Sequence, residues 1–495
     1  LGTPTTRFDG RDQNQRIFVP VTIENVGDAR ITNNFQVVLF LSSDTTAGND
    51  YQYNSKSIPV DVFPGQVLRP NLSVAMPHDL FGVSGQPVLD SGAYHIRGLI
   101  LYDNGATDAS AANNSVITPE TINITYTFGG PLPKGNFRNK LTTVARSLDV
   151  VSFDILGAGR GELDTSNGGM VVRLFDTNGG TKLRIKVLSP FGSVTLDGLE
   201  INGPIDTIEG SAVTLAGNFT VTGNLGLVRL AAINGSQWRV DGDRPWAARI
   251  GSVVNTSLDS SARIQELNVG SWFNTDNNTD AVIAPRIDRL ISPGTFRPDV
   301  VLSGAGSSSK PALGRAIVGS SVSGKWDING GADTVLLQST VDGFAINVRG
   351  TLKTLSISAD LRGIVAAATI RSVFIGGNMT DAAIVAGTDF GSDANIGGTG
   401  TAADTFGPGR VVSFHLRGNM TGSLVSAALN PINGQYLDAD DRFASGDSLV
   451  GSVRVNGALT GSSFYAPRFG KAILNGKVIN TATDPNFVSN LPFTE

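Results

Sequence analysis

Apolar and polar residues alternate along most of this chain, in short segments separated by Gly, Pro, Asn and Asp. In the first 128 residues the alternating segments are 17–24, 35–41, 57–62, 67–74, 93–102 and 121–128. Alternation with a period of two is typical of β-strands that bury one face. About seven short strands with frequent turns are typical of a β-sandwich. We therefore predict a β-sandwich over residues 1–128.

A second pattern, a repeat of nine residues, is clearest between residues 346 and 386. Its first positions are Ile346, Leu355, Ile364, Val373 and Ala382, and the third and seventh positions are also mostly apolar. The fifth position is always Gly or Ala, which indicates a tight bend or a close approach between neighbouring segments. Strands that recur at a short fixed period are typical of a solenoid. The repeat alone leaves coils of two facets and coils of three facets equally open.

A longer repeat also favours stacked coils. The segments 375–380, 416–421 and 455–460 share a Gly-Asn-Met-Thr-like pattern and recur at intervals of 41 and 39 residues. Asn-Gly pairs along this region supply corners with positive φ. We therefore predict a parallel β-helix over residues 136–495. An antiparallel sandwich array or a propeller is the alternative, because a nine-residue period with short turns also suits meanders.

The boundary between the two regions is predicted at residues 129–135, with the sequence GGPLPKG. Pro and Gly at this density interrupt both helices and strands. Helical periodicity is confined to residues 139–148, a segment expected to cap the first coil and to block edge-to-edge pairing. The predicted fold class is therefore all-β, with a sandwich, a linker and a solenoid in that order.

Composition narrows the classes of function. The chain has 495 residues, a formal net charge of −5 and no Cys, which excludes disulfides, thiolate metal sites and Cys nucleophiles. The three His residues lie far apart in the sequence, which argues against a His-based metal site or triad. Positive charges form no cluster along the sequence, which argues against a binder of nucleic acid or of other polyanions. No run of 18 apolar residues is present to span a membrane.

Two long insertions, 387–409 and 430–447, carry the candidate chemistry. They follow corresponding positions of adjacent repeats, so we expect them to emerge side by side. Carboxylate oxygens on Gly-rich loops are suitable ligands for Ca²⁺, and solvated loop acids are the alternative. The insertions contain Asp389, Asp393, Asp404, Asp438, Asp440, Asp441 and Asp447. The predicted metal ligands are Asp438, Asp440, Asp441 and Asp447.

The same loops are the only candidates for catalysis. Some β-helix hydrolases use two Asp residues as acid and base, which requires two carboxylates about 5–10 Å apart. A lyase would instead need Lys or Arg beside Ca²⁺, and Arg442 is the nearest such residue. Few aromatic side chains lie near these loops, whereas a sugar-binding groove usually has more. We assign no catalytic and no cofactor-binding residue, and a protein without enzyme activity is favoured.

Several segments of the first region resemble a known family. They are Val21–Gly27 (VTIENVG), Leu39–Asp44 (LFLSSD), Phe63-Pro64-Gly65 and Asp103-Asn104. Over residues 8–128 the chain resembles the bacterial CARDB-type (cell-adhesion-related) immunoglobulin-like domain. Together with the segment 151–161 and the Gly-rich coils, it resembles secreted proteins of planctomycete-type bacteria. This resemblance implies an immunoglobulin-like sandwich, an extracellular or cell-surface location in a bacterium, and no assigned chemistry.

These observations predict a non-enzymatic extracellular structural or adhesion protein. Its expected partners are an envelope or matrix polymer or neighbouring protein subunits, including further copies that build a surface filament or layer. Nucleic acid is not an expected partner. The alternative is a polysaccharide-active β-helix enzyme, or a carbohydrate-binding module, that uses the stacked acidic loops.

Overall fold

The computed structural model describes residues 5–9, 14–32, 34–46, 51–58, 61–75, 92–102, 115–124, 126–129, 140–144, 149–166, 169–189, 192–276, 278–304, 310–397, 399–436 and 438–494. Within these ranges every regular element is a β-strand, apart from one short 3-10 turn at Gly400–Ala402. The predicted all-β class is therefore confirmed. Across the same ranges, no helix has the length and apolar character needed to cross a membrane.

The chain folds into two compact units. The first contains Leu1–Thr177 and Thr181–Gly198, and the second contains Asn178–Gly180 and Leu199–Glu495. Residues 130–135 of the predicted linker, and Asp103-Asn104, lie outside the described residues.

The N-terminal part of the first unit consists of antiparallel sheets. One sheet has the order β1 (Thr5–Asp9), β2 (Asn14–Pro20), β7 (Asn71–Ala75). A second has the order β5 (Tyr51–Ile58), β4 (Phe35–Ser42), β8 (Gly92–Tyr102), β9 (Ser115–Ile124), and β3 (Ile23–Glu24) pairs with β6 (Val67–Leu68). The predicted strands at 35–41 and 93–102 are confirmed. The strand predicted at 57–62 is misplaced, since β5 ends at Ile58, before Pro59, which has no N–H to donate.

The rest of the first unit also pairs antiparallel. β10 (Tyr126–Gly129) pairs with β13 (Arg160–Asp164), and β13 pairs with β14 (Val171–Phe175). β11 (Lys140–Val144) pairs with β12 (Val150–Leu156), which pairs with β15 (Lys182–Val187). These pairings correct two predictions. Parallel coils do not begin at residue 136, because the strands between residues 140 and 187 pair antiparallel. The segment 139–148 is not a helical cap, because its β-branched run Thr142-Thr143-Val144 belongs to a strand.

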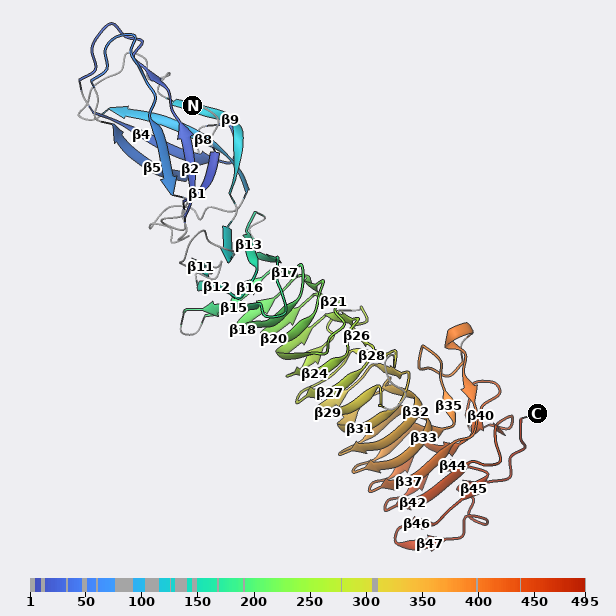
Figure 1. Ribbon diagram of the computed structural model, residues 1–495. Helices are drawn as coiled ribbons and strands as arrows, with labels where there is room; N and C mark the ends of the chain where they lie inside the picture. Colours follow the sequence, from blue (N-terminus) through green and yellow to red (C-terminus); the bar gives the residue numbers. More distant parts are fainter. Residues whose placement is uncertain are drawn as a thin grey trace. The chain divides into compact units, whose positions relative to one another are not determined.

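The second unit is a solenoid in which strands of successive coils pair in parallel (Figure 1). One facet, here called the first face, is built from β18 (Ile205–Leu215), β20 (Leu225–Asn234), β22 (Trp246–Val254), β24 (Ile264–Val269), β27 (Ile287–Ser292), β29 (Leu313–Val322), β31 (Ala332–Thr340), β32 (Ala345–Ile357), β33 (Leu361–Ile375), β37 (Arg410–Leu416), β42 (Leu449–Val455) and β46 (Ala472–Leu474).

A second facet is here called the second face, and a third, shorter ladder contains β25 (Trp272–Phe273), β38 (Met420–Thr421) and β43 (Leu459–Thr460). The second face is built from β17 (Gly198–Ile201), β19 (Phe219–Val221), β21 (Gln237–Val240), β23 (Ser257–Ser260), β26 (Ala281–Ala284), β28 (Asp299–Leu302), β30 (Lys325–Ile328), the first halves of β32 and β33, β34 (Met379–Ala386), β39 (Leu424–Ala427), β44 (Ser463–Tyr465) and β48 (Phe487–Val488). β32 and β33 are long because each bends and contributes to both faces.

The nine-residue repeat corresponds to successive facets of one coil. On the first face Leu355 pairs with Val373, 18 residues later, and both side chains are buried. On the second face Ile346 pairs with Val365, one residue beyond the expected Ile364. The corner before this strand contains Gly363 at φ +90°, where a Cβ atom would lie 2.1 Å from the Phe344 carbonyl oxygen. The one-residue shift itself is a β-bulge between Val348 and Thr351, where this coil has one residue more than the next.

The solenoid encloses a continuous apolar interior. Trp272, Phe296, Trp326 and Phe344 follow one another with ring centroids 5.9, 5.9 and 6.0 Å apart. All four rings are fully buried and meet edge to face, which is a favourable geometry for aromatic pairs. Side chains from consecutive coils thus pack as ladders, and this packing fixes the positions of the loops that leave the coils.

Candidate functional site

The two insertions leave the second face at the same position of adjacent coils. The first follows β34 and the second follows β39, and these strands pair in parallel from Ala383 and Leu424 to Ala386 and Ala427. Each insertion starts and ends in a short antiparallel pair. These pairs are β35 (Thr388–Asp389) with β36 (Thr405–Phe406), and β40 (Leu429–Asn430) with β41 (Arg442–Phe443). The predicted juxtaposition of the loops is confirmed (Figure 1).

The insertions fold down onto the outer side of the second face. There they form a second apolar cluster outside the solenoid core, composed of Ala366, Val385, Phe390, Leu424, Leu429 and Phe443. The C-terminal segment joins them, because the Phe443 N–H donates to the Pro492 carbonyl (2.8 Å) and the Thr494 N–H donates to the Phe443 carbonyl (3.0 Å). We call the insertions together with residues 491–494 the cover. The second face is therefore buried on both sides in these coils.

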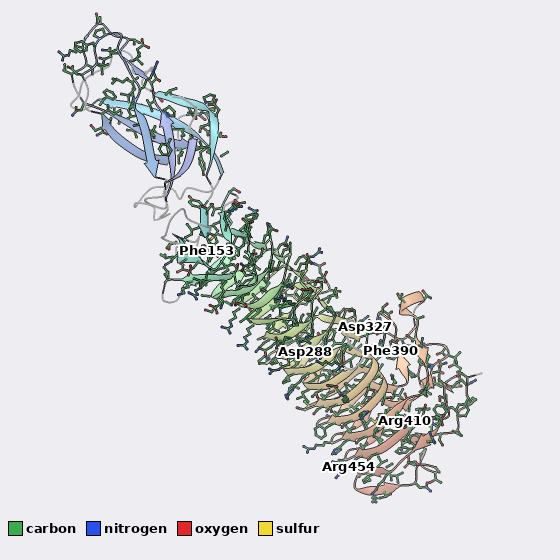
Figure 2. All side chains as sticks on the ribbon, in the orientation of Figure 1. Phe153, Asp288, Asp327, Phe390, Arg410 and Arg454 are labelled. Carbon is green, nitrogen blue, oxygen red and sulfur yellow. The ribbon has the colours of Figure 1, made fainter. Side chains whose placement is uncertain are left out.

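A buried polar group fastens the first insertion to the coils. The Asn347 amide donates to Asp389 Oδ1 (2.8 Å) and to the Gly391 carbonyl (3.1 Å), and its Oδ1 accepts from the Phe390 N–H (3.2 Å). Arg349 donates to Asp327 Oδ2 (3.0 Å) and lies 3.3 Å from Asp389 Oδ2. Figure 2 labels Asp327 and Phe390 on neighbouring parts of this junction.

Burial changes the protonation of the junction acids. Desolvation raises the pKa of Asp327, although the Arg349 guanidinium lowers it. Desolvation also raises the pKa of Asp404, whose Oδ2 accepts the Gly397 N–H at 2.7 Å. Asp393 accepts the Asn395 N–H at 3.1 Å within its own loop. Carboxylates of the first insertion therefore hold loop backbone and coil side chains together.

In the second insertion, three of the four predicted metal ligands come together. Ligand oxygens of Asp438, Asp440 and Asp441 all lie within 4.8 Å of one another. The close approach of the two side chains lowers the pKa of Asp438 and raises that of Asp440. Asp441 is fully buried, whereas Asp438 is exposed.

The fourth predicted ligand lies outside this cluster. The Asp447 side chain is 89% exposed and lies 3.6 Å from the Arg468 guanidinium, which also donates to the Asp447 carbonyl. Asp447 follows Arg442 by five residues, beyond the end of β41, so the chain has already left the acidic turn.

Tyr436 joins the two insertions. Burial raises the pKa of its hydroxyl, the nearby Asp404 and Asp441 raise it further, and Thr388 of the first insertion lowers it. The sequence gives no signal for Tyr436, Asn347 or Arg349 as a group, because they are separated by many residues and meet only after the coils have stacked.

No family model, no curated protein and no solved structure matches this chain.

Proposed function

We propose that this chain is a non-enzymatic extracellular structural or adhesion protein of a bacterial surface. In this proposal an immunoglobulin-like sandwich precedes a parallel β-helix. The observation that carries the proposal is that the two insertions, where an active site was considered, pack onto the second face. Carboxylates of the first insertion bond to loop backbone, to Asn347 and to Arg349, instead of lining an open groove.

The enzyme alternative rests on Asp438 and Asp440. Oxygens of these two carboxyls lie within 4.8 Å of each other, whereas the acid and base of glycosidases stand about 5 Å or more apart to admit substrate and water. Arg442, the nearest base for a lyase, donates to the Ala439 carbonyl (3.2 Å) and the Asp441 carbonyl (2.9 Å). Both features favour a structural role for this turn over a catalytic one.

The proposal includes a structural Ca²⁺ held by Asp438, Asp440 and Asp441. Hard oxygen ligands from closely spaced carboxylates suit Ca²⁺, whose charge would offset the repulsion among the three carboxylates. Asp447 takes no part in it, because its carboxylate faces Arg468. A bound ion would stabilise the second insertion and, through Tyr436, the whole cover.

A first experiment separates catalysis from structure. The whole protein and its Asp438→Asn, Asp440→Asn and Asp441→Asn variants are incubated with a panel of polysaccharides, and reducing ends and thermal unfolding are measured with Ca²⁺ or with a chelator. We expect that neither the wild type nor any variant releases reducing ends. In Ca²⁺ the variants should have a lower Tm than the wild type, and with the chelator their Tm should equal that of the wild type. The matched control is Asp28→Asn, an exposed acid of the first unit. Release of reducing ends by the wild type, lost in Asp438→Asn without a change in Tm, would establish the enzyme instead.

A second experiment tests adhesion and assembly. The whole protein is mixed with bacterial envelope fragments and with matrix polysaccharides, sedimented, and imaged by electron microscopy. We expect cosedimentation or ordered arrays of the protein. A protein that stays monomeric and binds neither preparation would overturn the proposal.

A further inference from the structure

Three neighbouring strands of the first face carry an unusual concentration of arginine. Strands β33, β37 and β42 lie next to one another in parallel, with Phe374 opposite His415 and His415 opposite Arg454. Arg371, Arg410, Arg417 and Arg454 are exposed on or directly after these strands. We call this surface the basic face, and Figure 2 labels Arg410 and Arg454 on it.

No acidic residue balances these charges. The segments 369–375, 410–417 and 449–456 contain no Asp and no Glu. Across the part of the chain that the structure describes, none of the four arginines takes part in an ion pair; Arg417 lies over the Phe374 ring (5.1 Å), and Arg454 donates to Asn456 (3.2 Å). Asp404, six residues before Arg410, accepts the Gly397 N–H, and Asp447, seven residues before Arg454, faces Arg468. Burial, Arg454 and Arg417 lower the pKa of His415.

Several arginines of earlier coils on the same face have carboxylate partners. In earlier coils Arg229 lies 3.5 Å from Glu209, and both Arg249 and Arg289 lie 3.1 Å from Glu266. Arg286 lies 2.7 Å from Asp288, which Figure 2 labels. Like charges side by side on adjacent strands are unfavourable, and in the earlier coils Glu209 and Glu266 offset the neighbouring pair Arg229 and Arg249. The basic face therefore carries a charge arrangement that the solenoid does not need for its own stability.

The basic face also offers groups that bind sugars. Ser372, Ser413 and Ser452 stand in register across the three strands, beside the row formed by Phe374, His415 and Arg454. Adjacent strands lie about 4.8 Å apart, so donors repeat at short, regular intervals. Guanidinium groups bind carboxylate and sulfate through two parallel hydrogen bonds, and hydroxyl groups bond to sugar hydroxyls.

We propose that the basic face binds a linear polysaccharide that carries carboxylate or sulfate groups. The sequence argues against a polyanion binder because its positive charges are dispersed, but stacking brings together residues from positions 371 to 454. A single-stranded nucleic acid would need a series of aromatic platforms, and the only aromatic residues on the outer side here are Phe374 and His415, which pack edge to face against each other. This inference rests on the proposed adhesion function in that it specifies the polymer.

Binding of the whole protein to four probes tests the inference. The probes are dextran sulfate, polygalacturonate, neutral dextran and a single-stranded oligonucleotide, measured by calorimetry at low and high salt. We expect binding to dextran sulfate or polygalacturonate that weakens with salt, and none to neutral dextran. The double variant Arg417→Gln/Arg454→Gln should weaken binding by roughly 10-fold or more. The matched control Arg229→Gln/Arg249→Gln removes the same charge from the same face and should change binding less than about twofold.

Three results would overturn the inference: no binding to either acidic polysaccharide, equal losses in the double variant and its control, or tighter binding of the oligonucleotide. If Arg417→Gln/Arg454→Gln does not fold, Arg371→Gln/Arg410→Gln replaces it, because these two side chains make no ion pair among the described residues. The outcome is separable from the adhesion proposal. If the protein binds dextran sulfate but not envelope fragments, this inference stands and the adhesion proposal is refuted. If the double variant still binds envelope fragments, the adhesion proposal stands and this inference is refuted.

Discussion

The two faces of the same coils differ on their outer sides. In the coils that contain β33 and β34, the second face carries Ala366 and Val385 outward and is buried beneath the cover. The first face of neighbouring coils carries Ser and Arg outward and stays open to solvent. On both faces, apolar side chains point into the core in equally regular rows. The comparison shows that the inner rows specify the solenoid, whereas the outer rows decide what each face can contact.

The largest expected effect comes from weakening the cover. Phe443 is fully buried between the insertion and the second face, and Phe443→Ala should destabilise the cover by about 3–5 kcal/mol through lost burial and a residual cavity. Hydrogen exchange should accelerate in residues 387–409 and 430–447 while the first face stays protected. The control Phe273→Ala removes a partly exposed ring on the outer side and should have a much smaller effect. Equal loss of protection in all coils would show that the cover and the coils unfold as one.

The second largest effect is expected where Asn347 and Arg349 contact the first insertion. Asn347→Ala removes four hydrogen bonds and leaves the Phe390 N–H and Asp389 without their buried partner, which should destabilise the first insertion by about 2–3 kcal/mol. Limited proteolysis should then cut within residues 387–409. Asn378→Ala, which removes an exposed bond to the Asn419 N–H, is the control and should leave the cutting rate unchanged. A similar rate for both variants would refute the role of Asn347.

The junction should also depend on pH. Burial raises the pKa of Asp327 above its ordinary value of 3.8, with Arg349, Asp389 and Asp393 as the charged groups near it. The folded state therefore binds the Asp327 proton more strongly than the unfolded state, so this contribution to stability is complete at low pH and is lost as the pH rises through the raised pKa. The free energy of unfolding of wild type relative to Asp327→Asn should fall between about pH 4 and neutrality. A difference that is constant or rises with pH would contradict this assignment.

The smallest effect should come from the open face. Arg249→Gln breaks an exposed ion pair with Glu266 and should cost about 0.2–1 kcal/mol, less in high salt. Arg454→Gln breaks no ion pair in the described residues and should be neutral or slightly stabilising, because it relieves repulsion with Arg417 and His415. Urea unfolding at two salt concentrations measures both. A larger loss for Arg454→Gln would mean that the basic face supports the fold.

Sequence patterns predicted the inner rows well. Alternation identifies Leu355, Ile357, Val373 and Ile375 as core residues, because each strand that lines the solenoid hides every second side chain. The same reasoning failed over residues 140–187, where alternation is equally clear but the strands run antiparallel. Alternation reports which side of a strand is buried and not the direction of its neighbour, which the turns decide.

The candidate site was predicted only in outline. Equivalent loop positions predicted that the insertions meet, and the Asp438–Asp441 turn is local enough to be seen in the sequence. The cover and the basic face were not visible. Outward apolar residues such as Val385 look like ordinary core residues, and Arg371, Arg417 and Arg454 become neighbours only through the stacking of coils that are interrupted by the insertions.

The interior aromatic ladder has a practical consequence for following unfolding. All four tryptophans of the chain are buried within residues 238–326, ahead of the insertions and outside the first unit. Their fluorescence is therefore a built-in reporter of the middle coils and is insensitive to events at either end of the chain. Emission that changes later than circular dichroism during heating would reveal that the molecule melts from its ends inward.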